Sequence, residues 1–119
     1  MVTVLVVDDN REVAELFQTC LSLCGKMRVL LAGTVKEALH TCRDNTEIDI
    51  LLSDLSLPDG TGADLLRALG ASAPAIKLLI TGHCFKGKYH GFDDYMVKPI
   101  DCSELLGKVR QLIHERKCA

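Results

Sequence analysis

Residues 49–60 read D-I-L-L-S-D-L-S-L-P-D-G, and this stretch decides how the rest of the chain folds. The short apolar run over 50–52 is typical of a strand that is buried on both faces of a parallel sheet. Asp54 follows where this strand should end, and open α/β sheets bind ligands beyond the carboxyl ends of their strands. The proline and glycine within 55–60 predict a turn. Taken alone, Asp54 is equally consistent with a carboxylate that only caps this loop.

The composition indicates one ordinary globular domain over residues 1–119. A hydrophobic fraction of 48% with 25% charged residues excludes a disordered or collagen-like chain. The net charge is −2, and no predicted helix carries a cluster of Lys and Arg, so we expect no direct binding of nucleic acid. The first apolar run is short and lacks a basic flank, so we expect neither a signal peptide nor a membrane span, and a cytoplasmic location.

Cysteine is frequent, with six residues scattered along the chain. No secretory signal accompanies them, so we expect reduced thiols that behave as small hydrophobic side chains. There is no C-x-x-C pair, and Cys20 and Cys24 have no nearby histidine, which argues against a zinc site.

Strand patterns and helix patterns alternate along the chain. The predicted strands cover residues 2–7, 27–32, 50–54, 76–80 and 94–97, and the predicted helices cover 11–24, 34–42, 63–69 and 101–113. Between Gly82 and Gly91, glycines and mixed polar residues predict a loop or a stunted fourth helix. Five βα units with buried strands predict a doubly wound parallel sheet that is covered by helices on both faces.

The first predicted helix has an apolar stripe at helical spacing. This stripe consists of Val13, Leu16, Phe17, Cys20 and Cys24, and Gly25 is expected to end the helix in left-handed geometry.

Reactive side chains recur at the carboxyl ends of the predicted strands. They are Asp8 and Asp9 after the first strand, Asp54 after the third, Thr81 after the fourth and Lys98 after the fifth. Three carboxylates brought together repel one another unless a hard divalent cation neutralises them, and Mg²⁺ prefers such oxygen ligands. A hydroxyl donor and a mobile ammonium complete a set of groups suited to phosphoryl transfer.

With Tyr95 three residues before Lys98-Pro99, these landmarks make the whole chain resemble the receiver domain of two-component response regulators. The resemblance implies a flavodoxin-like (βα)5 fold with strand order 2-1-3-4-5. It also implies that Asp54 accepts a phosphoryl group from a phosphohistidine on a sensor histidine kinase or a histidine phosphotransfer protein. Such a domain is a signalling switch, whose only catalysis is its own phosphorylation and dephosphorylation.

The resemblance further implies a role for each matching residue. Mg²⁺ would be bound by Asp9, Asp54 and the backbone carbonyl of Ser56, with Asp8 acting mainly through water. Lys98 would pair with Asp54 and later with the phosphoryl group.

The remaining matches concern the response to phosphorylation. Thr81 would hydrogen-bond a phosphoryl oxygen, Tyr95 would change rotamer, and the Lys98-Pro99 bond would be cis. His83 lies close enough in sequence to influence hydrolysis of the acyl phosphate.

The interval from Thr81 to Lys98 is about one helical turn or more shorter than in familiar receivers. The fourth helix forms part of the usual dimerisation and output face in that family. We therefore expect a monomer before phosphorylation, a weakened dimer through that face, and output to an unknown downstream protein through the first or last helix.

Other functions remain to be weighed. The chain could be a stand-alone regulator or a receiver module excised from a hybrid histidine kinase. A phosphatase of the haloacid dehalogenase type has its nucleophilic Asp after the first strand in a D-x-D arrangement, which Asp8-Asp9-Asn10 does not match. No G-x-G-x-x-G or P-loop follows the first strand, which disfavours a nucleotide-binding module. A degenerate interaction module is disfavoured by the complete set of acidic, hydroxyl and lysine residues.

Overall fold

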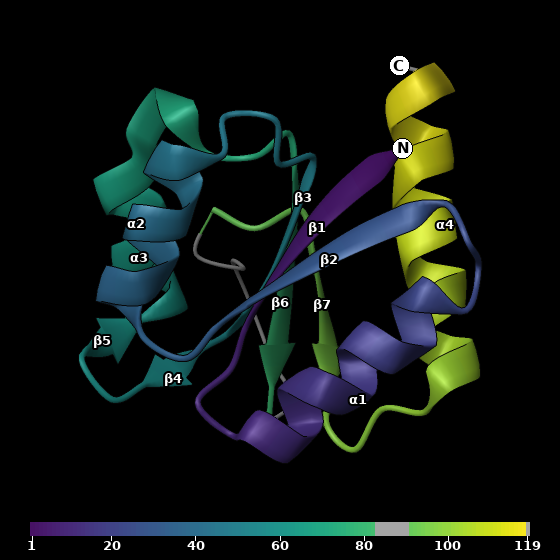
Figure 1. Cartoon of the computed structure of the whole chain (residues 1–119), viewed down its shortest axis with the longest axis horizontal. Coiled ribbons are helices and arrows are strands. Elements are labelled where there is room, and N and C mark those ends of the chain that lie inside the picture. The colour runs from purple at the N-terminus through teal and green to yellow at the C-terminus, as the bar shows by residue number, and fades with distance from the viewer. Residues whose placement is uncertain (83–90, 119) are drawn as a thin grey trace.

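The computed structural model describes residues 1–82 and 91–118 as an α/β structure (Figure 1). Its strands are β1 (Val2–Val7), β2 (Met27–Ala32), β3 (Ile50–Asp54), β4 (Ser56–Leu57), β5 (Gly60–Thr61), β6 (Ile76–Thr81) and β7 (Asp94–Val97). Its helices are α1 (Arg11–Ser22), α2 (Val35–Asp44), α3 (Gly62–Leu69), the 3₁₀ turn η1 (Gly70–Ser72) and α4 (Cys102–Cys118). The stunted fourth helix expected after Gly82 lies outside the described residues.

The main sheet has five strands in the order β2-β1-β3-β6-β7, and every neighbouring pair is parallel. In chain order of the sheet strands this is 2-1-3-4-5, which confirms the predicted topology. The register places Asp54 beside Ile80, and Thr81 beside Val97. The carboxyl ends of β3, β6 and β7 therefore meet at one edge of the sheet.

The two faces of the sheet carry two separate hydrophobic clusters, as expected for strands that are buried on both sides. Alternate residues of β1 divide between them: Val4 and Val6 face α1 and α4, while Leu5 and Val7 face α2 and α3. All four side chains are at most 1% exposed. Figure 1 shows the same division, with α1 and α4 on one side of the sheet and α2 and α3 on the other. The predicted doubly wound arrangement is thereby confirmed.

Helix α1 differs in part from the predicted stripe. Asn10 caps its first turn by accepting from the N–H groups of Glu12 and Val13. Leu16 was expected in the core but is 53% exposed, and Leu21 is buried instead. The stripe was placed wrongly at Leu16 because helical spacing also fits a position at the edge of the apolar face. Gly25 has a φ of 71°, in the left-handed region predicted for it.

The segment after Asp54 is more ordered than the predicted turn, because β4 and β5 pair as a small antiparallel hairpin. Asp59 lies at its tip and reaches the start of α2. There it accepts hydrogen bonds from the N–H of Val35 at 2.7 Å and of Lys36 at 3.0 Å. Both are orphan donors of a helix N-terminus, so Asp59 joins the loop that follows Asp54 to a neighbouring helix.

These bonds give the stability a dependence on pH. The N–H groups of Lys36 and Val35 lower the pKa of Asp59 below its ordinary value. A lowered pKa means that the stabilisation is complete above about pH 4 and is lost as the pH falls through the folded-state value. We expect Asp59→Asn to lower the melting temperature by about 3–6 °C at pH 7, and this difference from wild type to be smaller at pH 3. Melting curves followed by circular dichroism would measure this, with the exposed Glu47→Gln as control. A constant difference at both pH values would contradict it.

The prediction that every cysteine is a separate reduced thiol is wrong for one pair. Cys20 of α1 and Cys102 of α4 form a disulfide, with Cα atoms 5.4 Å apart. That separation lies in the usual disulfide range, but only the helix packing reveals it because 82 residues separate the two cysteines in sequence. Cys24 and Cys42 are free thiols.

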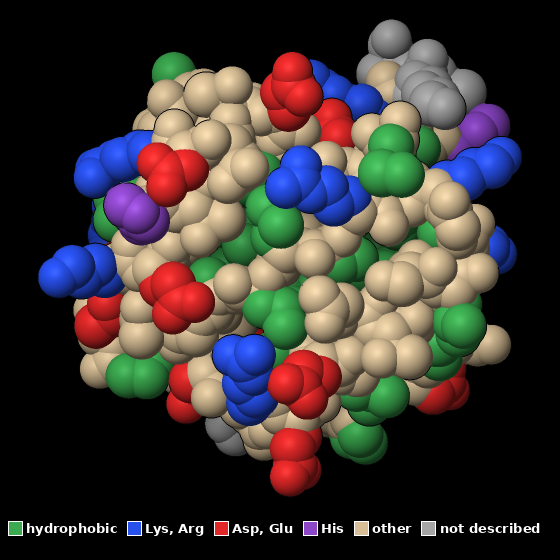
Figure 2. Space-filling model, viewed as in Figure 1, with side chains coloured by type: hydrophobic (Ala, Val, Ile, Leu, Met, Phe, Trp, Pro, Cys, Tyr) green, Lys and Arg blue, Asp and Glu red, His purple; other side chains and the backbone are tan. Residues whose placement is uncertain are grey.

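The surface carries both signs of charge. Figure 2 shows Lys and Arg side chains interspersed with Asp and Glu on the face that it presents. Within the described ranges, no helix has the length and apolarity that a bilayer crossing requires.

Candidate functional site

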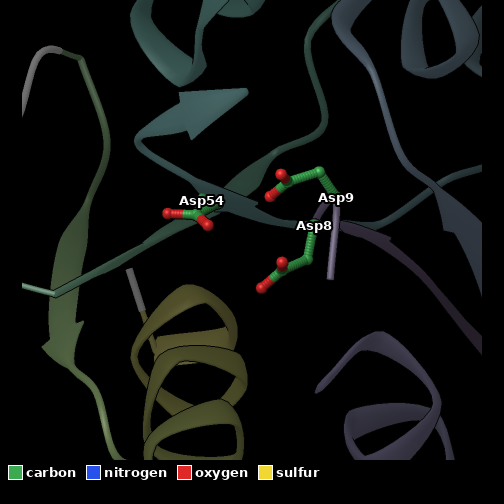
Figure 3. A group of neighbouring side chains, drawn as sticks. All are labelled: Asp8, Asp9 and Asp54. Carbon is green, nitrogen blue, oxygen red and sulfur yellow. The ribbon is translucent and has the colours of Figure 1, made fainter. Parts of the chain in front are cut away.

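Three carboxylates gather at the carboxyl edge of the sheet (Figure 3). Asp8 and Asp9 follow β1, and Asp54 is the last residue of β3, the neighbouring strand. One carboxylate oxygen from each lies within 4.8 Å of the others. Asp8 is only 4% exposed, Asp54 is half-buried and Asp9 is exposed. The three predicted acidic residues therefore form one cluster that opens to solvent on the side of Asp9.

Lys98, directly after β7, reaches two of these carboxylates. Its Nζ donates to Oδ2 of Asp8 at 2.9 Å and to Oδ2 of Asp54 at 3.1 Å. Burial alone would lower the pKa of Lys98, but the hydrogen bonds from Nζ to Asp8 and Asp54, with the attraction of both charges, raise that pKa above its ordinary value. Lys98 therefore stays protonated at neutral pH, and it is the cation that the buried Asp8 contacts.

Thr81 lies on β6, the strand beside that of Asp54, and Tyr95 lies on β7, the next strand in the sheet. Thr81 ends β6, is 1% exposed, and accepts a hydrogen bond at its backbone carbonyl from the N–H of Lys98 at 2.8 Å. Tyr95 of β7 is the register partner of Leu79 and packs against the cluster on the α2 and α3 face. Because side chains alternate along a strand, Thr81 and Tyr95 point to this same face. Thr81 and Tyr95 therefore lie on one side of the sheet, on neighbouring strands.

The other expected site residues have separate positions. Ser56 is exposed at the start of β4, two residues after Asp54, and pairs with Thr61 of β5. The peptide bond between Lys98 and Pro99 is cis. His83 lies outside the described residues.

Two residues that support Asp54 were not anticipated from the sequence. Ser53 is fully buried and donates its hydroxyl to the backbone carbonyl of Asp54 at 2.9 Å. Gly62, the first residue of α3, comes so close that a Cβ built on it would lie 2.8 Å from that same carbonyl. No motif marks either residue: Ser53 contacts the residue next to it, and the approach of Gly62 depends on how α3 packs against the end of β3.

This close approach predicts a large effect of a single methyl group. We expect Gly62→Ala to destabilise the protein by about 1–3 kcal/mol, because the new Cβ meets backbone that cannot move aside freely. Gly107→Ala is the matched control, since Gly107 lies within α4 and nothing lies within 4 Å of a Cβ there. That control should stabilise the helix by about 0.5–1 kcal/mol. Urea denaturation would measure both, and equal effects of the two substitutions would contradict the argument.

The chemistry of the donor set fits a hard divalent cation. Three carboxylates and one ammonium leave a formal charge of −2 on the cluster. Carboxylate oxygens are the ligands that Mg²⁺ prefers, and Mg²⁺ needs only one or two of them because it keeps several waters. The exposed Asp9 leaves the cluster accessible to such an ion.

Fold and site together define the class: a doubly wound α/β domain with an acidic, lysine-paired site at its strand ends. The family model of the response regulator receiver domain matches residues 4–110. CpxR, a transcriptional regulatory protein of Escherichia coli K12, is 34% identical over 92% of this chain and 48% of its own length. The chain spans about a fifth to a half of the length of such curated relatives.

Solved structures agree with this assignment. The chemotaxis response regulator CheY4 of Vibrio cholerae is 25% identical, with a TM-score of 0.85 over 94% of this chain and 98% of that one. The receiver domain of the hybrid histidine kinase CckA is 28% identical, with a TM-score of 0.79 over 92% and 97%. The chain belongs to the response regulator receiver domain family, whose members are phosphoacceptor signalling domains rather than enzymes that turn over a substrate.

Proposed function

We propose that this chain is a single receiver domain in which Asp54 accepts a phosphoryl group from a phosphohistidine on a histidine kinase or a histidine phosphotransfer protein. The observation that carries the proposal is the convergence of Asp8, Asp9, Asp54 and Lys98 at one edge of the sheet. Of the three carboxylates, Asp54 alone is half-buried, which leaves it accessible and yet held in place by its neighbours.

The chemical step needs little from the protein beyond positioning and charge. An oxygen of the Asp54 carboxylate attacks the phosphorus, the bond from phosphorus to the imidazole nitrogen breaks, and the imidazole keeps the electron pair. A carboxylate is already ionised, so this nucleophile requires no general base. Lys98 is the positive charge beside the oxygens of Asp54, and it stabilises the charge on the transferring group.

In this proposal Asp9 and Asp54, with the backbone carbonyl of Ser56, would hold Mg²⁺, and Asp8 would act mainly through water. The ion supplies neutralisation of the phosphoryl oxygens when it is bound. Asp8 keeps a second role because Lys98 contacts it directly, so it holds the ammonium at the edge of the site.

Signalling follows from the charge that Asp54 gains. An aspartyl phosphate adds a dianionic group beside Lys98 and requires further hydrogen-bond donors. Thr81 can supply its hydroxyl only by moving, and Tyr95 packs on the same face of the sheet, so its rotamer follows. The changed surface is then read by a downstream protein.

Location and context complete the proposal. We place the domain in the cytoplasm, where its phosphodonors act. The same chemistry serves a stand-alone regulator and the receiver module of a hybrid histidine kinase, and CckA among the similar structures is an example of the second arrangement.

The test is phosphorylation by a small donor. The protein is incubated with acetyl phosphate, with Mg²⁺ or with EDTA, and its intact mass is measured. We expect the addition of one phosphoryl group that requires Mg²⁺, is stable in acid and is labile in base. Repeated turnover of a generic phosphate ester without an adduct would instead indicate a phosphatase of the haloacid dehalogenase type and overturn the proposal.

A further inference from the structure

A disulfide between Cys20 and Cys102 joins helix α1 to helix α4. Cys20 lies two residues before the end of α1 and is 4% exposed, whereas Cys102 is the first residue of α4 and is half-buried. Both side chains belong to the hydrophobic cluster on that face, and the helices lie side by side (Figure 1). Their Cα separation of 5.4 Å allows a disulfide without moving the backbone.

The same two helices are already tied together at the site. Helix α1 begins at Arg11, three residues after Asp8, and α4 begins four residues after Lys98. The Asp8–Lys98 ion pair and the Cys20–Cys102 disulfide therefore close one ring of contacts. It runs from Asp8 through α1 to Cys20, and from Cys102 back through the loop after β7 to Lys98. Lys98 therefore cannot move away from Asp8 without a change of conformation elsewhere in this ring.

We propose that Cys20 and Cys102 are a reversible dithiol–disulfide site, and that oxidation there hinders phosphorylation of Asp54. The second half rests on the proposed function. In the cytoplasm, thiols are kept reduced and a protein disulfide is transient and regulatory. The disulfide holds the start of α4 against α1, which favours the arrangement in which Lys98 stays on Asp8 and Asp54. The phosphorylated state needs Lys98 at the phosphoryl group, so oxidation opposes it.

The oxidant is a small disulfide of the glutathione type. Cys102, the more accessible thiol, loses its proton and attacks one sulfur of this disulfide, which releases one thiolate and leaves a mixed disulfide on Cys102. The sulfur of Cys20 then loses its proton, attacks the sulfur of Cys102 and expels the second thiolate. The two protein thiols are oxidised by two electrons, the small disulfide is reduced to two thiols, and the two protons pass to them.

The experiment has two independent measurements on the full chain. The protein is equilibrated with oxidised or reduced glutathione, its free thiols are alkylated, and the Cys20 to Cys102 linkage is mapped by peptide mass. Each sample is also treated with Mg²⁺ and acetyl phosphate. We expect the linkage under oxidation, its loss on reduction, and a phosphorylated fraction about fivefold or more lower in the oxidised sample.

Single substitutions test whether the loss of phosphorylation depends on Cys20 and Cys102. Cys102→Ser should be phosphorylated equally with and without the oxidant, and Cys20→Ser should match it. Cys24→Ser is the control, because Cys24 lies just beyond the same helix as a free thiol, and this variant should retain the wild-type response. Since Cys20 is buried and its replacement can impair folding, Cys102→Ser alone suffices for the test.

Each remaining outcome decides a different point. If the Cys20 to Cys102 linkage does not form in oxidised glutathione, the proposed dithiol–disulfide site is disproved. A linkage that leaves the phosphorylated fraction unchanged would overturn the coupling. If the reduced protein takes no phosphoryl group at all, the proposed function and the coupling fail together, while the thiol mapping still decides whether the pair is reversible.

Discussion

Replacing Asp54 by asparagine is expected to abolish the phosphoryl adduct and reduce labelling by acetyl phosphate to background. The amide has nearly the same shape as the carboxylate, but it lacks the charge and nucleophilicity that attack on phosphorus requires. Folding should be retained, because the substitution removes one of three mutually repelling carboxylates and leaves Lys98 paired with Asp8. Intact mass spectrometry with Mg²⁺ would measure the labelling, and circular dichroism would verify the fold.

Asp9→Asn is the matched control for this prediction. Asp9 belongs to the same cluster but is exposed, and the ion pairs of Lys98 among the described residues are with Asp8 and Asp54, so the role of Asp9 in the proposal is confined to the metal. We expect this variant to label slowly and to need more Mg²⁺, yet to carry its adduct on Asp54. Persistence of a full adduct in Asp54→Asn, on Asp8 or on a nearby hydroxyl, would disprove the assignment of the acceptor.

The sheet and the strand-end residues could be predicted from the sequence because both follow from local pattern. The runs at 2–7 and 50–52 are almost entirely apolar, so both of their faces had to be covered. Side chains that follow parallel strands must then meet at one edge, which is why Asp8, Asp54 and Lys98 converge.

The features that escaped prediction depend on tertiary distances. Asp59 contacts α2 across a gap of 24 residues, and Gly62 is required only because the carbonyl of Asp54 passes close to it. Cys20 and Cys102 are paired by helix packing, which spacing within either helix does not encode. In each case the residue can be read from the sequence, but only the folded structure shows which group it contacts.

Most of these contacts act on the same part of the molecule. They fix the backbone around the site and do not supply its chemistry. The hydroxyl of Ser53 and the close approach of Gly62 hold the carbonyl of Asp54. Asp59 anchors the hairpin that follows Asp54 to α2. The backbone around Asp54 is therefore fixed by contacts in which Lys98 takes no part. Lys98 is consequently the residue whose removal best separates phosphorylation from its structural response.

The second large effect is expected from Lys98→Met, which keeps the length of the side chain and removes its charge. Asp8 would lose its cation while its side chain is only 2% exposed, and breaking a buried pair typically costs about 3–5 kcal/mol. Because the side chain of Lys98 is 27% exposed, water can replace part of the interaction, and we expect a loss of about 1–3 kcal/mol in EDTA. Mg²⁺ should restore part of this stability in urea denaturation, because a cation at the carboxylates offsets the missing ammonium.

The same variant should still be phosphorylated, since Asp54 and the metal ligands remain, although more slowly because the charge of Lys98 is missing, and Thr81 and Tyr95 should fail to respond. Nuclear magnetic resonance signals of the Tyr95 ring, recorded before and after acetyl phosphate, would report this response. Lys108→Met is the matched control, because Lys108 pairs with Asp94 at 2.8 Å with a similar exposure of 25% but lies away from the carboxylate cluster. The control should lose some stability and keep the full Tyr95 response. A normal response in Lys98→Met would mean that the aspartyl phosphate moves Thr81 unaided, and that the ion pair with Asp8 serves folding alone.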